Sequence, residues 1–250
     1  MVDYELDEQG YGVITINRPK KRNAISKQMI QALDTYVEQA KIDRVTFLII
    51  TSAGEEMFCA GGDLTYLHGN LSPIEAFQRL DPMKQVNYKI ATFPVPVICL
   101  LNGDAIGGGC EIATACDIRI AKEGTSFGFV QSNLGILPGW GGGTLLYEKV
   151  NPDFALQWLL EGFMLKAERL REIGWIHHVI PQDLFCVRDK LLKSYLNKSY
   201  KQMLLLKEQY NKKMKRNDLL EKMTQEVKNT ANIWGSVEHK MVVEKFLSRK

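Results

Sequence analysis

The stretch Asn102-Gly103-Asp104-Ala105-Ile106-Gly107-Gly108-Gly109-Cys110-Glu111 decides the fold, because it joins a strand pattern to a helix pattern through three contiguous glycines. The run before it, residues 97–101, is wholly apolar, as a buried strand requires. The exposed N–H groups of a helix start favour negative charge, although glycines there can also serve only a tight turn. A dinucleotide-binding GxGxxG pattern does not fit, because the glycines are contiguous and no acidic residue follows at the required spacing.

A second small-residue loop, Met57-Phe58-Cys59-Ala60-Gly61-Gly62-Asp63-Leu64, follows another strand pattern at residues 45–51. We expect a short helix after this loop as well. Two such loops after two strands predict backbone N–H donors that converge on one point. A pair of donors aimed at one carbonyl oxygen forms an oxyanion hole, and this arrangement suits the enolate of a thioester.

The rest of the first half alternates strand and helix patterns, which is typical of the α/β class. We expect strands at residues 12–16 and 117–121, a helix at 26–41 capped by Ser26, and a helix at 74–92. From about residue 153 onward helical patterns dominate, apart from a strand-like run at 176–180. The Lys- and Leu-rich stretch 198–228 predicts amphipathic helices that cover a core or a neighbouring subunit.

Composition excludes several classes of protein. The chain has 250 residues, 45% of them hydrophobic, which is enough for a sizeable core. Its net charge of +3 gives little field for gripping nucleic acid, and no apolar run is long enough to span a membrane. Without a leader pattern at the N-terminus, we expect a cytoplasmic protein. The five cysteines form no CxxC pair and the histidines no metal constellation, so we expect reduced thiols and no metal.

Five motifs appear in the order found in the crotonase (enoyl-CoA hydratase/isomerase) superfamily, which the chain resembles. They are Asn17-Arg18-Pro19-Lys20 with Asn23-Ala24, then Phe58 to Leu64, Asn102 to Glu111, Cys116-Asp117-Ile118-Arg119 and Gly135-Ile136-Leu137-Pro138-Gly139. The resemblance implies an α/β spiral of ββα repeats over residues 1–195 and a helical trimerisation region over 196–250. It also implies an acyl-CoA thioester substrate, no cofactor beyond that coenzyme A, and a homotrimer or a dimer of trimers.

The resemblance also implies which groups act in catalysis. The N–H groups of Gly62 and Gly108 are the predicted oxyanion donors. Glu111 matches the first of the two glutamates of the family's hydratases, although a carboxylate at a helix start can also have only an electrostatic role. Gln131 stands where those hydratases have the second glutamate, and an amide neither donates nor accepts a catalytic proton near neutral pH.

Coenzyme A and acyl contacts are implied in the same way. The basic loop before Ala24 matches the family's adenine and phosphate contact, although a solvated basic loop has the same composition. Trp140 is expected to wall the acyl group, with an ordinary core position as the alternative. The full set of expected substrate contacts is Lys20, Arg22, Ala24, Ala60, Asp63, Leu64, Gly107, Pro138, Gly139, Trp140 and Lys245.

In keeping only the first glutamate, the sequence resembles the family's methylmalonyl-CoA and ethylmalonyl-CoA decarboxylases. Loss of CO₂ generates an enolate without a base, so the sequence favours decarboxylation of a short branched malonyl-CoA type thioester. Hydration or isomerisation of an enoyl-CoA is the alternative. A third reading is a non-catalytic CoA-binding or RNA-binding member; the acidic residues within 198–228 weaken the nucleic-acid part of it.

Overall fold

A computed structural model describes residues 1–63, 66, 71–214 and 218–247 of the chain, with side chains described as far as Val242. Its strands form two sheets. The larger sheet contains, in spatial order, β1 (Val2–Leu6), β2 (Gly12–Ile16), β3 (Leu48–Ser52), β5 (Val97–Leu101), β7 (Ile118–Lys122) and β10 (His178–Ile180). The smaller sheet contains β4 (Met57–Cys59), β6 (Asp104–Ile106), β8 (Ser126–Gly128) and β9 (Leu165–Lys166).

A repeating turn connects the two sheets. The parallel strands β3, β5 and β7 of the larger sheet are followed directly by β4, β6 and β8, which are parallel neighbours in the smaller sheet. A helix closes each repeat before the chain returns to the larger sheet. This confirms the predicted α/β spiral of ββα units.

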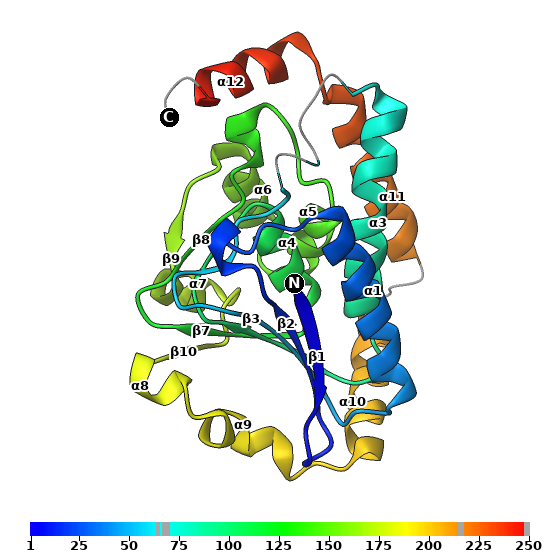
Figure 1. Cartoon of the computed structure of the whole chain (residues 1–250), viewed down its shortest axis with the longest axis vertical. Coiled ribbons are helices and arrows are strands. Elements are labelled where there is room, and N and C mark those ends of the chain that lie inside the picture. Colours follow the sequence, from blue (N-terminus) through cyan, green and yellow to red (C-terminus); the bar gives the residue numbers. More distant parts are fainter. Residues whose placement is uncertain (64–65, 67–70, 215–217, 248–250) are drawn as a thin grey trace.

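Helices cover the sheets and the end of the spiral. In Figure 1, α1, α3 and α11 run along one side of the molecule, while α4 and α5 lie at its centre. The bounds are α1 (Lys27–Ile42), α3 (Pro73–Ala91), α4 (Gly108–Ala115), α5 (Gly142–Lys149), α6 (Pro152–Glu161), α7 (Ala167–Ile173), α8 (Gln182–Phe185), α9 (Arg188–Leu196), α10 (Tyr200–Lys213), α11 (Leu219–Ile233) and α12 (Val237–Leu247), with 3-10 turns η1 (Pro19–Lys21) and η2 (Gln131–Leu134).

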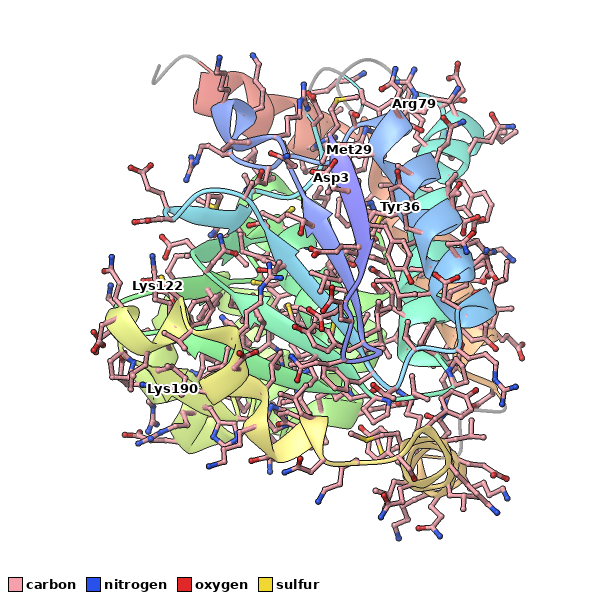
Figure 2. The ribbon with its side chains drawn as sticks, turned by 60° about the horizontal axis from the view of Figure 1, so that its bottom comes forward. Asp3, Met29, Tyr36, Arg79, Lys122 and Lys190 are labelled. Carbon is pink, nitrogen blue, oxygen red and sulfur yellow. The ribbon has the colours of Figure 1, made fainter. Side chains whose placement is uncertain are left out.

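The first helix forms as its sequence predicts. The Ser26 hydroxyl accepts a hydrogen bond from the Met29 N–H and caps α1. One face of α1 is buried, and on its edge Tyr36 stacks on Tyr4 of β1 with ring centroids 5.8 Å apart. Figure 2 shows Met29 and Tyr36 on this helix beside the first strands. The periodic apolar positions therefore attach α1 to the edge of the larger sheet.

The short strands differ from the expectations. Met57–Cys59 is a strand and not part of a loop, and the helix expected after Asp63 falls on residues 64–65 and 67–70, outside the described residues. β6, β8 and β9 were not predicted, because two or three residues carry too little alternation to be recognised. Their positions are determined by pairing with strands far along the chain.

The C-terminal helices fold back over the core of the same chain. α11 packs along α3, and the Lys207 ammonium of α10 forms an ion pair with Asp117, which precedes β7. Lys207 also donates to the carbonyl oxygen of Ala91, 3.1 Å away. The predicted boundary between the spiral and the helical region at residue 195, and the predicted trimer, stay predictions.

The described residues were also compared with the requirements of a membrane-spanning helix and of a metal site. Within them, no helix combines the length and apolar character that crossing a bilayer requires, and no group of three or more His, Cys, Asp or Glu side chains has metal-binding geometry. His177 accepts a hydrogen bond from the Arg119 N–H through Nδ1 at 3.1 Å.

Candidate active site

The two glycine loops meet at one edge of the smaller sheet. β4 and β6 are parallel neighbours, so the segments that follow them leave the sheet at the same edge. A Cβ atom on Gly61 would lie only 3.2 Å from the amide nitrogen of Gly108. Gly61 has φ +89°, a conformation that suits glycine, and this lets the two backbones approach. The structure thus brings the segments of Gly62 and Gly108 together.

The N–H groups of both predicted donors lie outside the regular pairing of their segments. Around Gly62, the Ile25 N–H donates to Gly61 and the Asp63 N–H donates to Ile25, so the strand-like pairing bypasses the Gly62 N–H. Gly108 is the first residue of α4, where an N–H group has no intrahelical acceptor. Among the described residues neither N–H group has an acceptor. The oxyanion role of this pair stays a prediction that this geometry allows.

The basic loop is anchored to the same place by hydrogen bonds and an ion pair that we did not predict. Asn23 is buried, has φ +55°, and donates through Nδ2 to the carbonyl oxygens of Ala53 at 2.9 Å and Met57 at 2.7 Å. The Arg18 guanidinium forms an ion pair with Asp63, and the Ala60 N–H donates to the Arg22 carbonyl oxygen at 3.0 Å. The loop that carries Lys20 and Arg22 is therefore attached to both sides of the Gly62 segment.

The expected coenzyme contacts lie on this loop and on the segment beside it. The side chains of Lys20 and Arg22 are exposed, and Ala24 and Ala60 are half-buried beside them. The Asp63 carboxylate forms an ion pair with Arg18, and the expected contact of Asp63 with the substrate stays a prediction. Leu64 lies outside the described residues, as does the side chain of Lys245. Coenzyme A binding by this set stays a prediction.

Glu111 is the buried carboxylate of the site. It lies in the first turn of α4, is 2% exposed, and accepts four hydrogen bonds. The N–H groups of Trp140 and Gly142 bond to Oε2 at 2.7 and 2.9 Å, the Gly139 N–H bonds to Oε1 at 3.3 Å, and the Gln131 amide bonds to Oε1 at 3.0 Å. Burial raises the pKa of Glu111, and these donors partly oppose that rise.

Gln131 meets Glu111 directly. Its Nε2 amide group donates to the carboxylate, while its Oε1 atom is buried without a hydrogen-bond partner among the described residues. A Cβ atom on Gly107 would contact the Gln131 amide at 3.6 Å, so this side chain reaches the start of α4. An unsatisfied buried acceptor beside a carboxylate can bind a hydroxyl or water donor.

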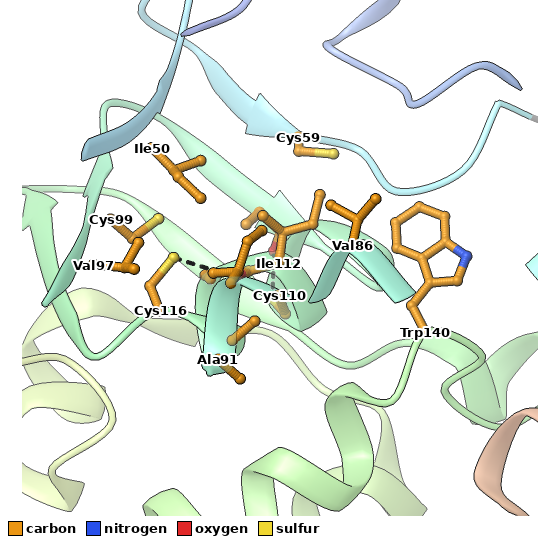
Figure 3. Close-up of a cluster of buried hydrophobic side chains, with 14 of the residues drawn as sticks. Ile50, Cys59, Val86, Ala91, Val97, Cys99, Cys110, Ile112, Cys116 and Trp140 are labelled. Carbon is orange, nitrogen blue, oxygen red and sulfur yellow. Dashed lines mark hydrogen bonds between the residues drawn. The ribbon is translucent and has the colours of Figure 1, made fainter. Parts of the chain in front are cut away.

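Trp140 covers the middle glycine. A Cβ atom on Gly108 would lie 2.2 Å from the Trp140 ring, so the indole packs directly on the Gly108 backbone. The ring is 3% exposed, and the Trp140 carbonyl oxygen accepts from Asn87 of α3 at 3.0 Å. Figure 3 shows the indole at the edge of the buried cluster that contains Cys59, Val86 and Ile112. Pro138 and Gly139 precede it and are also buried.

The structure adds a carboxylate that sequence reasoning missed. Glu226 of α11 accepts hydrogen bonds from the N–H groups of Gly143, at 3.3 Å, and Thr144, and from the Thr144 hydroxyl at 2.7 Å. Burial and the negative charge of Glu111 raise the pKa of Glu226 to about 8. No local pattern identifies this residue, because α11 comes to the site only through its packing on α3 and α5.

Relatives of known name share this architecture. Residues 7–250 match the family model described as enoyl-CoA hydratase/isomerase. The chain is 35% identical to the crotonyl-CoA hydratase of Syntrophomonas wolfei over 83% of this chain and 80% of that protein. It is 32% identical to the short-chain-enoyl-CoA hydratase of Clostridium acetobutylicum over 84% and 81% of the two chains.

Solved structures agree at the level of the fold. A putative enoyl-CoA hydratase from Mycobacterium avium paratuberculosis has a TM-score of 0.87 and 24% identity over all of this chain and 97% of that one. The names of the two relatives that are about one third identical favour the hydratase alternative over the decarboxylase that the sequence favoured. The chain belongs to the enoyl-CoA hydratase/isomerase family of the crotonase superfamily, whose members act on acyl-CoA thioesters.

Proposed function

We propose that the chain is a lyase that adds water to the double bond of a short-chain 2-enoyl-CoA. The observation that carries the proposal is the Glu111 carboxylate, held by four donors in the same helical turn as the Gly108 N–H group. A carboxylate beside an enolate site can accept a proton from water and return one to carbon. The names of the relatives that are about one third identical support the same reaction.

The proposed reaction uses these groups in three steps. The N–H groups of Gly62 and Gly108 bind the thioester oxygen and stabilise its negative charge as water attacks the β-carbon. Glu111 accepts the proton that the water loses while the new C–O bond forms. The α-carbon then takes a proton from the protonated Glu111, the enolate returns to a thioester, and one water has been added in total.

The position of Trp140 favours a substrate with a short acyl group. Its indole occupies the space directly over Gly108, where the acyl chain must pass the oxyanion donors. The ring is fixed by burial and by the Asn87 hydrogen bond to its backbone. We therefore expect crotonyl-CoA to be a better substrate than enoyl-CoA thioesters with longer chains.

Decarboxylation is a second candidate, and Gln131 favours it. The amide donates to Glu111 and supplies no second acid or base. Loss of CO₂ from a malonyl-type thioester forms the same enolate without removal of a proton, so one carboxyl group is enough to protonate the α-carbon.

One paired assay distinguishes the two reactions. Purified protein is given crotonyl-CoA, with loss of the enoyl absorbance as the readout, and separately methylmalonyl-CoA, with CO₂ release as the readout. We expect hydration, and we expect Glu111→Gln to lower its kcat by about 10²-fold or more. The control Glu75→Gln removes an exposed carboxylate that caps α3, and it should leave kcat unchanged. CO₂ release with no hydration would replace the proposal by the second candidate.

A further inference from the structure

Two carboxylates share the first turn of one helix. α5 begins at Gly142, and its first three N–H groups belong to Gly142, Gly143 and Thr144. Glu111 of α4 accepts from the first of these, and Glu226 of α11 accepts from the other two. The two acids therefore approach the same partial positive charge of the helix from different elements.

The described residues place no cation against this pair. Within the part of the chain that the structure describes, neither glutamate forms a salt bridge. On the elements packed around them, Lys84 of α3 is paired with Asp81 and Thr224, and Lys222 of α11 is paired with Asp218. Tyr147 of α5 feels the charge of Glu226 and cannot supply a positive one.

Two neighbouring anions in a partly dehydrated place are costly, so such a pair retains one proton over a wide pH range. Three of the four donors to Glu111 are backbone N–H groups, which cannot accept a hydrogen bond in return, and the Gln131 side chain also presents its N–H group to this carboxylate. Glu226 differs because one of its partners is the Thr144 hydroxyl, 2.7 Å from Oε2, and a hydroxyl can also accept. The proton is thus better accommodated on Glu226, in agreement with its pKa of about 8.

We propose that Glu226 is a positioning residue that retains the proton of a Glu111–Glu226 pair, keeps Glu111 ionised, and sets the alkaline limit of activity. The inference rests on the proposed enolate chemistry of Glu111. When Glu226 loses its proton, a second negative charge appears beside the place where the anionic enolate must form. That charge opposes the transition state, so activity declines as Glu226 ionises.

The pH dependence of kcat/KM with crotonyl-CoA tests this directly. For the wild type we expect a plateau near neutral pH and a decline with a midpoint close to the Glu226 pKa of about 8. Glu226→Gln keeps an acceptor for the α5 N–H groups but cannot ionise. We expect this variant to keep the plateau rate within about threefold and to lose the alkaline decline, so that above about pH 9 it exceeds the wild type several-fold.

A matched control and a second readout separate this inference from the proposed function. Glu75→Gln, at the N-terminus of α3, should retain the alkaline decline of the wild type. Thermal unfolding needs no substrate: in the wild type, stability should fall between about pH 4.5 and about pH 8, because the folded state holds the Glu226 proton more tightly than the unfolded chain. That fall should be smaller in Glu226→Gln.

Reciprocity supplies a third test in case Glu226→Gln folds poorly. Glu111→Gln removes the charge that helps to hold the proton on Glu226, so the alkaline end of the stability loss should move to lower pH. Equal alkaline declines in the wild type and Glu226→Gln, or equal pH profiles of unfolding in the wild type and Glu111→Gln, would overturn the inference. Absence of hydratase activity together with the expected unfolding profiles would reject the proposed function and retain the pair.

Discussion

At the scale of single residues, the hydrogen-bond donors of the candidate site converge on one carboxylate, that of Glu111. Glu111 accepts hydrogen bonds from the N–H groups of Gly139, Trp140 and Gly142, so the loop before α5 holds its carboxylate in place. The fourth donor is a side chain, Gln131, and it is the partner that a single substitution can turn into an acid. An amide at position 131 cannot exchange a proton, whereas an acid there would add a second titratable carboxyl group beside Glu111.

Replacing Gln131 by glutamate tests this control. The new carboxyl group would lie about 3 Å from Glu111, and two carboxyl groups that close share a proton, one serving as acid and the other as base. We expect Gln131→Glu to raise kcat for crotonyl-CoA hydration by about tenfold or more and to lower any release of CO₂. Gln131→Met, which has a similar volume and no amide, should lower hydration; a gain there would contradict the argument.

At the scale of elements, the site depends on two parallel strands that end side by side. β4 and β6 deliver the Gly62 segment and the start of α4 to one edge, and Gly61 lets them approach. Arg119 of β7 supports the far end of α4, because its guanidinium donates to the carbonyl oxygens of Ala113, at 3.3 Å, and Cys116, at 2.7 Å. A cation at a helix C-terminus stabilises that end.

Gly61→Ala tests the close approach of the two loops. Its Cβ would lie 3.2 Å from the backbone nitrogen of Gly108, so α4 must shift and the two predicted oxyanion donors must separate. We expect kcat for crotonyl-CoA to fall about 10²-fold, the usual cost of losing one such donor. Gly174→Ala is the matched control: Gly174 has φ +92° against +89° for Gly61, with nothing within 4 Å of its Cβ.

Both alanine variants carry the same backbone strain, about 1 to 2 kcal/mol at positive φ. Gly61→Ala adds the close contact with Gly108, so its melting temperature in thermal unfolding should fall at least as far as that of Gly174→Ala, while only Gly61→Ala loses activity. Equal kcat values in the two variants would show that the approach of the loops does not matter for catalysis.

At the scale of the whole molecule, the C-terminal helices complete the site that the spiral begins. α11 supplies Glu226 to α5, and its Thr230 hydroxyl donates to the Pro138 carbonyl oxygen at 2.6 Å. α10 is tied to the larger sheet by the Lys207–Asp117 ion pair, whose side chains are 2% and 10% exposed. The helical region is thus part of the folded unit and of the site.

Lys207→Met tests this attachment. The substitution leaves the Asp117 carboxylate buried without its cation, which typically costs about 3 to 5 kcal/mol of the free energy of unfolding. Lys212→Met is the control on the same helix, because its pair with Glu208 is exposed and such pairs contribute about 0.5 kcal/mol. Chemical denaturation of the three proteins should show a large loss only for Lys207→Met, and equal losses would contradict a role for the buried pair.

The sequence by itself determined the elements with strong local patterns. Helix α1 follows from its apolar spacing and from the Ser26 cap, and strand β5 follows from its apolar run. Each signal lies within the short segment that it describes. The motif order indicated the family, and Glu111 lies close to Gly108 simply because both belong to one helical turn. These conclusions need only contacts between residues near each other in the chain.

Only the tertiary structure decided which groups surround Glu111. Trp140 packs on Gly108 and Glu226 caps α5 because α3, α5 and α11 meet around α4, and no local periodicity encodes such a meeting. The same limit applies to the charges near Glu111: Gln131 in the sequence indicated a single carboxyl group, whereas packing brings a second one, Glu226, from α11. Long-range packing determines the charges around a buried acid, and those charges determine its chemistry.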